Sequence, residues 1–180
     1  MLQLEIPERE FYDEDTSTFV TIKKESLQLE HSLVSLSKWE ATWCKPFLSN
    51  ERKTREESID YIKCMTITQN VKPETYQFLP DHIFAIVEEY IAKPMTATWF
   101  SDNKIRSGSR EVVTAEIIYY WMISLNVPME CQKWHLNRLL TLIRVCNIKN
   151  QPSKKQSQKE SLASRAALNN ARKMKNNTHG

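Results

Sequence analysis

The chain has 180 residues, of which 41% are hydrophobic and 26% are charged. This length supports one globular core with appendages, and the composition excludes a fibrous protein and a wholly disordered chain. Only two glycines are present, Gly108 and Gly180. Their scarcity argues against an all-β fold rich in tight turns and against a glycine-rich phosphate-binding loop, so the composition favours helices.

The net charge of +3 is unevenly distributed along the chain. Residues 149–180 hold eight basic side chains and one acidic one, a net charge of +7, which leaves −4 for residues 1–148. The first fifteen residues hold six acidic residues and one basic residue, Arg9. This distribution predicts a mildly acidic body with a basic C-terminal tail, which suits an acidic protein surface or nucleic acid.

Three short segments near the N-terminus alternate apolar and polar residues with a period of two, as half-buried strands do. They are residues 2–6, which end at Pro7, residues 18–22 and residues 26–30. We expect these segments to form a small antiparallel sheet within residues 1–32.

The next segments have the spacing of helices. Apolar residues three or four apart from Leu33 to Trp43 predict a helix that Pro46 terminates. A second helix is predicted after a cap at Ser49 or Asn50. The charged residues directly after this cap are interpreted as the solvated first turns of that helix.

Prolines mark the start of two short helices that follow. Pro73 begins the first, and Pro80 precedes the second, which is expected to end before Pro94. Residues 95–100 are predicted to form a strand, and residues 101–110 a polar loop.

Two long helices are predicted over residues 111–125 and 128–147. The longest apolar run of the chain, residues 112–127, includes Glu116 and Asn126, so we expect no membrane span. The N-terminal segment lacks the basic start and apolar stretch of a secretory signal. We therefore expect the protein to stay in the compartment where it is made.

The C-terminal part has the composition of a linker followed by a weak helix. Residues 151–159 are mostly Gln, Ser, Lys and Pro, and residues 161–171 are good helix formers with few apolar anchors. The predicted fold is α+β and mainly α, a helical bundle with a small N-terminal sheet. It comprises a β region at 1–32, a helical body at 33–148 and a flexible basic tail at 149–180, disordered or helical on binding.

No pattern of residues predicts catalysis, a cofactor or a metal site. Cys131 and His135 are four apart in the last predicted helix, beside Glu130, but as zinc ligands or as a nucleophile pair they lack further partners. Nucleotide-binding loops and the nucleophile elbow are also missing from the sequence. The four cysteines lie far apart in apolar patterns and are interpreted as buried thiols. We predict that the chain is not an enzyme.

The basic tail contains no Phe, Tyr or Trp, the side chains on which nucleic-acid bases stack. We therefore expect its partner to be an acidic protein surface rather than nucleic acid. Such binding would weaken as salt concentration rises.

Three segments carry a resemblance to a known family. They are LVSLSKWEATWCKPFL at residues 33–48, PMECQKWHLNRL at residues 128–139 and AALNNARKMK at residues 166–175. Together they resemble the tail assembly chaperones of long-tailed bacteriophages. The resemblance covers the middle of the chain, the last long predicted helix and the tail.

The resemblance implies a non-enzymatic protein of virion assembly in the host cytoplasm. Such a chaperone binds the long helical tape-measure protein, keeps it soluble and leaves as tail-tube protein polymerises around it. The resemblance also implies a longer, frameshifted form of the chain, and it is compatible with self-association.

A tape-measure protein presents apolar helix faces before assembly, which aromatic side chains of a helical bundle can cover. The tryptophans also fit a role as core anchors. The candidate partner-binding residues are four tryptophans and four tail cations: Trp39, Trp43, Trp121, Trp134, Arg165, Arg172, Lys173 and Lys175.

Two other classes of protein fit the same composition. A structural virion protein, such as a head–tail connector, would persist in the finished particle, whereas a chaperone would be absent from it. A nucleic-acid-binding regulator would use the basic tail and would lose affinity steeply with salt.

Overall fold

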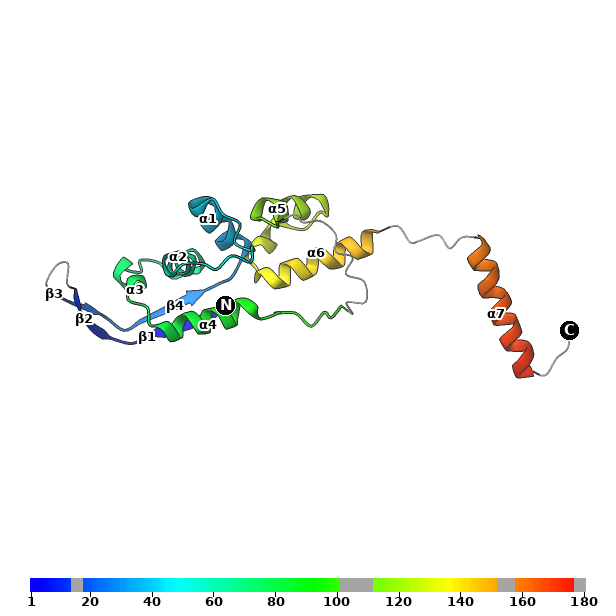
Figure 1. Ribbon diagram of the computed structural model, residues 1–180, viewed down its shortest axis with the longest axis horizontal. Helices are drawn as coiled ribbons and strands as arrows, with labels where there is room; N and C mark the ends of the chain where they lie inside the picture. The colour runs from blue at the N-terminus through cyan, green and yellow to red at the C-terminus, as the bar shows by residue number, and fades with distance from the viewer. Residues whose placement is uncertain (14–17, 101–111, 152–157, 177–180) are drawn as a thin grey trace. The chain divides into compact units, whose positions relative to one another are not determined.

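The structure, a computed structural model, describes residues 1–13, 18–100, 112–151 and 158–176. The chain falls into two compact units, Met1–Asn147 and Ile148–Gly180. Helices predominate, which confirms the α+β, mainly α prediction (Figure 1). The described elements are β1 (Leu2–Ile6), β2 (Arg9–Asp13), β3 (Thr18–Ile22), β4 (Glu25–Leu29), α1 (Leu33–Trp43), α2 (Arg55–Met65), α3 (Pro73–Gln77), α4 (Asp81–Ala92), α5 (Ala115–Ser124), the 3-10 helix η1 (Met129–Lys133), α6 (Leu136–Asn150) and α7 (Gln158–Asn176).

The four strands form two antiparallel pairs, β1 with β4 and β2 with β3. The register sets Leu4 opposite Leu27, and Leu2 opposite Leu29. Alternate residues of β1 and β4 are buried, so one face of this pair contributes Leu4, Ile6, Leu27 and Leu29 to the core. The strands predicted at the N-terminus are therefore confirmed.

The strand β2 was not expected, because Arg9, Glu10 and Asp13 interrupt its apolar pattern. Its pairing with β3 sets Tyr12 opposite Phe19, and the two exposed rings meet edge to face with centroids 5.2 Å apart. Such a pair is worth about 0.5–1.5 kcal/mol beyond its buried area. The aromatic pair therefore stabilises a ribbon that has charged neighbours.

The helix α1 occupies its predicted range and begins at a capping box. The Ser32 hydroxyl accepts a hydrogen bond from the backbone N–H of Ser35, and the Ser35 hydroxyl accepts one from that of Ser32. The helix ends at Cys44, whose φ of 51° is left-handed. The chain then turns toward Phe47, which is buried.

The helix α2 is capped by Thr54, so the cap predicted at Ser49 or Asn50 is wrong. Neither Ser49 nor Asn50 has a glutamate or glutamine three positions later, whereas Thr54 forms a capping box with Glu57. Glu57 is buried and also pairs with Lys45 at 2.7 Å. The interpretation of this charged run as solvated first turns is therefore wrong at Glu57.

The helices α3 and α4 begin and end as the prolines predict. The strand predicted over residues 95–100 is wrong, because this segment pairs with no described strand. Met95 has a left-handed φ of 50°, which interrupts an extended conformation, and Trp99 is 91% exposed. The loop predicted at 101–110 lies outside the described residues.

The last two predicted long helices differ from the structure. Helix α5 starts at Ala115, and the single helix predicted from Pro128 is wrong, because η1 and α6 are separated at Trp134 and His135. The backbone of Trp134 is extended, and the N–H of Leu136 donates to the carbonyl of His31 at 2.7 Å. Within the described part of the chain, no helix is long and apolar enough to cross a membrane.

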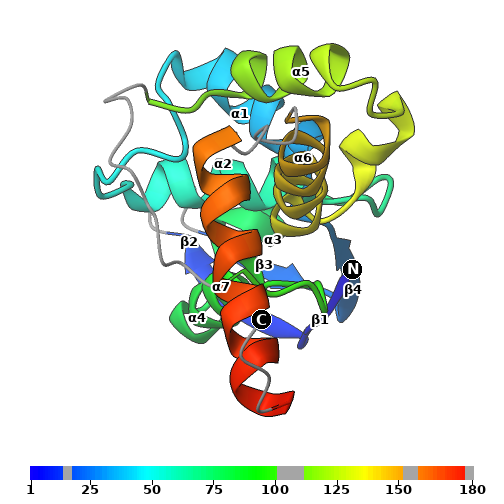
Figure 2. The same cartoon turned by 90° about the vertical axis from the view of Figure 1, so that its right-hand side faces the viewer.

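A buried carboxylate, that of Glu40 on α1, joins three parts of the body. Its Oε1 accepts from the backbone N–H of Phe47 at 2.8 Å, and its Oε2 accepts from that of Ala115 at 2.7 Å. Thr114 makes no side-chain cap for α5. Glu40 therefore satisfies an N-terminal N–H of α5 from another helix and fixes α5 against α1 (Figure 2).

The second unit contains the 19-residue helix α7. Its described side chains are all exposed, including Leu162, Leu168 and Met174. The helix is longer than the predicted segment 161–171 and includes the last residues of the predicted linker 151–159, most of which lies outside the described residues. That the tail becomes helical on a partner stays a prediction.

Candidate partner-binding site

Helix α5 is apolar around most of its circumference, yet only one side of it is buried. Ala115, Ile118 and Met122 are each 0% exposed in the core. On the opposite side, Tyr120 and Ile123 are 66% and 67% exposed. Glu116, which is exposed, lies on the same side of the helix as these two residues. Apart from it, Tyr120 and Ile123 define an uncovered apolar surface, the outer face of α5.

A cavity of about 400 Å³ lies beside the outer face, between α5 and α6. The volume of this cavity is within the range of pockets that accept large apolar groups. The guanidinium of Arg144, one of the lining residues, lies over the ring of Phe100, 4.1 Å from its centroid. The principal lining residues are Trp121, Leu125, Leu140, Ile143 and Arg144.

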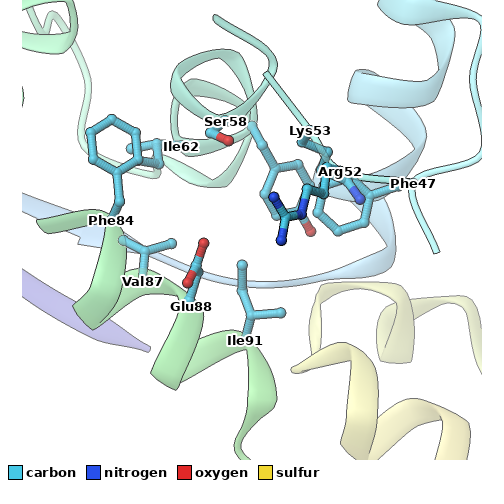
Figure 3. Close-up of a pocket in the computed structure, with 10 residues that line it drawn as sticks. Phe47, Arg52, Lys53, Ser58, Ile62, Phe84, Val87, Glu88 and Ile91 are labelled. Carbon is cyan, nitrogen blue, oxygen red and sulfur yellow. The ribbon is translucent and has the colours of Figure 1, made fainter. Parts of the chain in front are cut away.

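A second cavity, of about 520 Å³, lies between α2 and α4, and we call it the α2–α4 groove. Figure 3 shows Phe84, Val87 and Ile91 pointing from α4 toward α2, with Arg52 and Lys53 at the other side. The groove therefore combines a mostly apolar wall, which also carries Glu88, with a basic edge.

Hydrogen bonds fix both ends of α4, which forms one wall of this groove. Arg55, at the start of α2, pairs with Asp81 at 2.6 Å and donates to the carbonyl of Leu79 at 2.9 Å. At the other end, the Asn137 amide donates to the carbonyls of Ile91 and, at 2.8 Å, of Lys93. Arg55 therefore joins the start of α4 to the start of α2, whereas Asn137 joins the end of α4 to α6.

The four candidate tryptophans occupy different environments. Trp39 is 1% exposed and donates its Nε1–H to the carbonyl of Glu57 at 2.8 Å. Trp43 stacks on Trp39 and donates to the Asp60 carboxylate at 3.0 Å. The stacked pair thus belongs to the α1–α2 interface, and Trp39 is a core side chain.

The other two candidate tryptophans lie near α6. Trp121 is half-buried in the α5–α6 cavity, and Trp134 is half-buried before α6, under the guanidinium of Arg138 at 4.2 Å. Among the four, Trp121 is the one that adjoins the outer face of α5.

The four candidate cations of the tail lie on α7 and are exposed. Arg165 and Arg172 are seven residues apart, two helical turns, and therefore share one side of the helix. Lys173 and Lys175 lie in the last turn, where cations interact favourably with the helix dipole. The arrangement provides a basic helix suited to an acidic surface.

Two buried histidines meet in the core, His31 before α1 and His135 before α6. Their ring centroids are 5.1 Å apart, and His31 Nδ1 is hydrogen-bonded to the Tyr61 hydroxyl. His135 donates Nε2–H to the carbonyl of Tyr90 at 3.1 Å and accepts from the N–H of Asn137. Burial, reinforced by His135, lowers the pKa of His31 to about 3, and burial also lowers the pKa of His135. Both rings are therefore neutral structural groups near pH 7.

The prediction that Cys131 and His135 lie in one helix is wrong, since Cys131 lies in η1 and His135 follows the break. Burial raises the pKa of the Cys131 thiol, and burial raises that of Cys64 to about 11. These thiols are poor nucleophiles.

The four cysteines were predicted to be buried, but only Cys131 is fully buried, and Cys44 is exposed. Among the described residues, no group of three or more His, Cys, Asp and Glu could hold a metal ion.

Comparison with protein-family models, with curated proteins and with solved structures gave no match to this chain.

Neither the α2–α4 groove nor the outer face of α5 was predicted as a whole. Trp121 was the one predicted residue beside the outer face. Arg52 and Lys53 stood in a charged run that suggested full solvation, and the pairing of α2 with α4 depends on contacts between distant residues, such as Arg55 with Asp81. Helix α5 has an apolar sequence but is too short to span a membrane. This composition could have indicated a helix face that the rest of the chain leaves uncovered.

Proposed function

We propose that this chain is a non-enzymatic assembly chaperone that binds the tape-measure protein of a long-tailed bacteriophage in the host cytoplasm. The observation that carries the proposal is the outer face of α5, where Tyr120 and Ile123 remain exposed on an apolar helix. A chaperone for a helical client needs such a face, because a helix binds another helix by burying apolar side chains at helical spacing.

The α5–α6 cavity supports the same function. An apolar side chain of a client helix that crosses the outer face can enter the cavity against Trp121 and Leu125. Large apolar side chains buried in such pockets contribute most of the affinity of protein interfaces. The residue resemblance at 33–48 and 128–139 adds the identity of the client, the tape-measure protein, to this physical argument.

The basic helix α7 supplies a second, electrostatic contact in this proposal. Its exposed cations attract an acidic client surface, and a tethered second contact raises the overall affinity without changing the first. Client binding should therefore weaken with salt but persist through the apolar contact.

Co-expression with the tape-measure protein tests the proposal. The measurement is the soluble fraction of the tape-measure protein with and without this chain, together with co-purification of the two. We expect this chain to raise the soluble fraction and to co-purify with the client. An unchanged soluble fraction without co-purification would contradict the proposal.

A nucleic-acid-binding regulator is the second candidate function, and the exposed cations of α7 are the observation in its favour. The tail has no aromatic side chain for base stacking. Binding of this chain to labelled DNA or RNA at physiological salt, lost on removal of residues 151–180, would favour this candidate over the chaperone.

A further inference from the structure

The α2–α4 groove is lined by two cations, Lys53 and Arg52, and by one carboxylate, that of Glu88. Lys53 is half-buried, with its ammonium 4.4 Å from the centroid of the Phe47 ring, and Arg52 lies beside it at the edge of the groove (Figure 3). Neither residue forms an ion pair with a described carboxylate. Glu57 and Glu51 act on Lys53 electrostatically and raise its pKa, which partly offsets the effect of burial. Glu57 already binds Lys45 and the Thr54 N–H.

An ammonium group in this position favours an anionic partner. Partial burial removes water from the charge, which lowers the pKa of Lys53. A carboxylate placed at the basic edge would replace the lost hydration by a charge-assisted hydrogen bond. The ring of Phe47 is itself fixed by stacking on Tyr61, with centroids 3.8 Å apart, so the platform under Lys53 is rigid.

The opposite wall of the groove is mostly apolar, apart from Glu88. Phe84 and Ile91 are half-buried one above the other along α4, with the buried Val87 between them and Ile62 facing them from α2. The guanidinium of Arg55 covers the Phe84 ring at 4.9 Å, so the wall accepts aliphatic side chains rather than a stacked ring.

We infer that the α2–α4 groove binds an amphipathic helix of the client that carries a carboxylate on the same face as an aliphatic side chain. The aliphatic side chain packs against Val87 and Ile91, and the carboxylate pairs with Lys53 and Arg52. Residues three or four apart share a helix face, so one helical turn of the client supplies both groups. This inference deepens the proposed function and rests on it only for the identity of the client.

A synthetic peptide tests the groove independently of the tape-measure protein. The probe is a fluorescein-labelled amphipathic helix with leucines at helical spacing and one glutamate on the leucine face, and the readout is fluorescence anisotropy with the full chain. We expect the probe to bind, and we expect its affinity to fall about tenfold or more when its glutamate becomes glutamine, because the charge-assisted hydrogen bond is lost. This comparison leaves the protein itself unchanged.

Matched protein variants locate the contact. Lys53→Met keeps the aliphatic stem on Phe47 and removes the charge, and Arg52→Gln removes the neighbouring charge. Each should weaken the glutamate probe by a similar factor and leave the glutamine probe unchanged. Lys38→Gln, on the exposed surface of α1 and outside both cavities, is the control and should change neither affinity.

Three results would overturn the inference. The first is equal affinity for the glutamate and glutamine probes, and the second is an equal loss of affinity for the glutamate probe in Lys53→Met and Lys38→Gln. The third is the absence of any probe binding. If the inference fails in this way but the chain still co-purifies with the tape-measure protein, the proposed function stands and only the role of the groove is excluded. If the chain binds the probe but does not co-purify with the tape-measure protein, the proposed function alone is contradicted.

Discussion

Glu40 connects α1, the turn at Phe47 and the start of α5 through one buried carboxylate. Replacing Glu40 by alanine leaves the N–H groups of Phe47 and Ala115 without acceptors. Each unsatisfied buried donor costs about 1–3 kcal/mol, so Glu40→Ala should lower the free energy of unfolding by at least about 2 kcal/mol. Urea denaturation followed by tryptophan fluorescence measures this loss.

Glu130→Ala provides the control for this prediction, because Glu130 is exposed on η1. Its free energy of unfolding should stay within about 0.5 kcal/mol of the unsubstituted chain. Equal stability of the two variants would show that the Glu40 hydrogen bonds do not hold α5 in place.

The buried histidines predict a pH dependence of stability. Burial lowers the pKa of His31 to about 3 in the folded chain, from the ordinary value of 6.5 that applies in the unfolded chain, so between these pH values the unfolded chain binds more protons. Its contribution to the free energy of unfolding therefore falls as pH falls below 6.5, by about 1.4 kcal/mol per pH unit. His135, whose pKa is also lowered by burial although Glu30 opposes this, acts in the same direction.

Urea denaturation at several pH values between 6.5 and about 4.5 measures this slope, above the range in which most carboxylates titrate. His31→Gln, which has no titrating ring, should show a slope smaller by up to one proton. Stability that is constant over this range in the unsubstituted chain would mean that the rings become protonated without unfolding.

At the scale of single elements, α5 offers a test that separates folding from binding. Ile123 is 67% exposed and Ile118 is 0% exposed on the same helix. Ile123→Glu should strongly weaken co-purification with the tape-measure protein, while its free energy of unfolding stays within about 0.5 kcal/mol of that of the unsubstituted chain. Ile118→Ala should cost about 2–5 kcal/mol.

Thermal or urea denaturation and co-purification together check both α5 variants. Client binding by Ile123→Glu at the level of the unsubstituted chain would exclude the outer face of α5 as the docking surface. It would leave the fold unaffected.

The elements that the sequence predicted well are those specified by neighbouring residues. The range of α1 follows from apolar spacing before Pro46, and α3 and α4 follow from their prolines. Local patterns did not reveal the break before α6, because it depends on the hydrogen bond from Leu136 to His31, more than a hundred residues away. They also missed the cap at Thr54, although Glu57 three positions later completes a recognisable capping box.

The candidate site was less predictable than the fold for a related reason. The tryptophan spacing predicted four candidate binding residues, but it did not distinguish Trp39 in the core from Trp121 beside an uncovered face. Exposure depends on which face each helix turns toward its neighbours, and that is set by contacts such as those of Glu40.

At the scale of the whole molecule, the described core lies entirely within the unit Met1–Asn147. A chain that ends at Asn150 should therefore keep its free energy of unfolding within about 0.5 kcal/mol. Its affinity for the tape-measure protein should fall, and the remaining affinity should depend less on salt, because the cations of α7 are gone. Denaturation and binding at two salt concentrations test this, and a loss of stability above about 1 kcal/mol would show that the second unit supports the first.

Under the proposed function, this chain assists assembly and then leaves. The most direct measurement is quantitative mass spectrometry of the chain and of the tape-measure protein, both in complexes isolated from infected cells and in purified particles. We expect the chain to accompany the tape-measure protein in the cells and to be absent from the particles. A stoichiometric amount of the chain in purified particles would contradict the chaperone proposal and would favour a structural virion protein such as a head–tail connector.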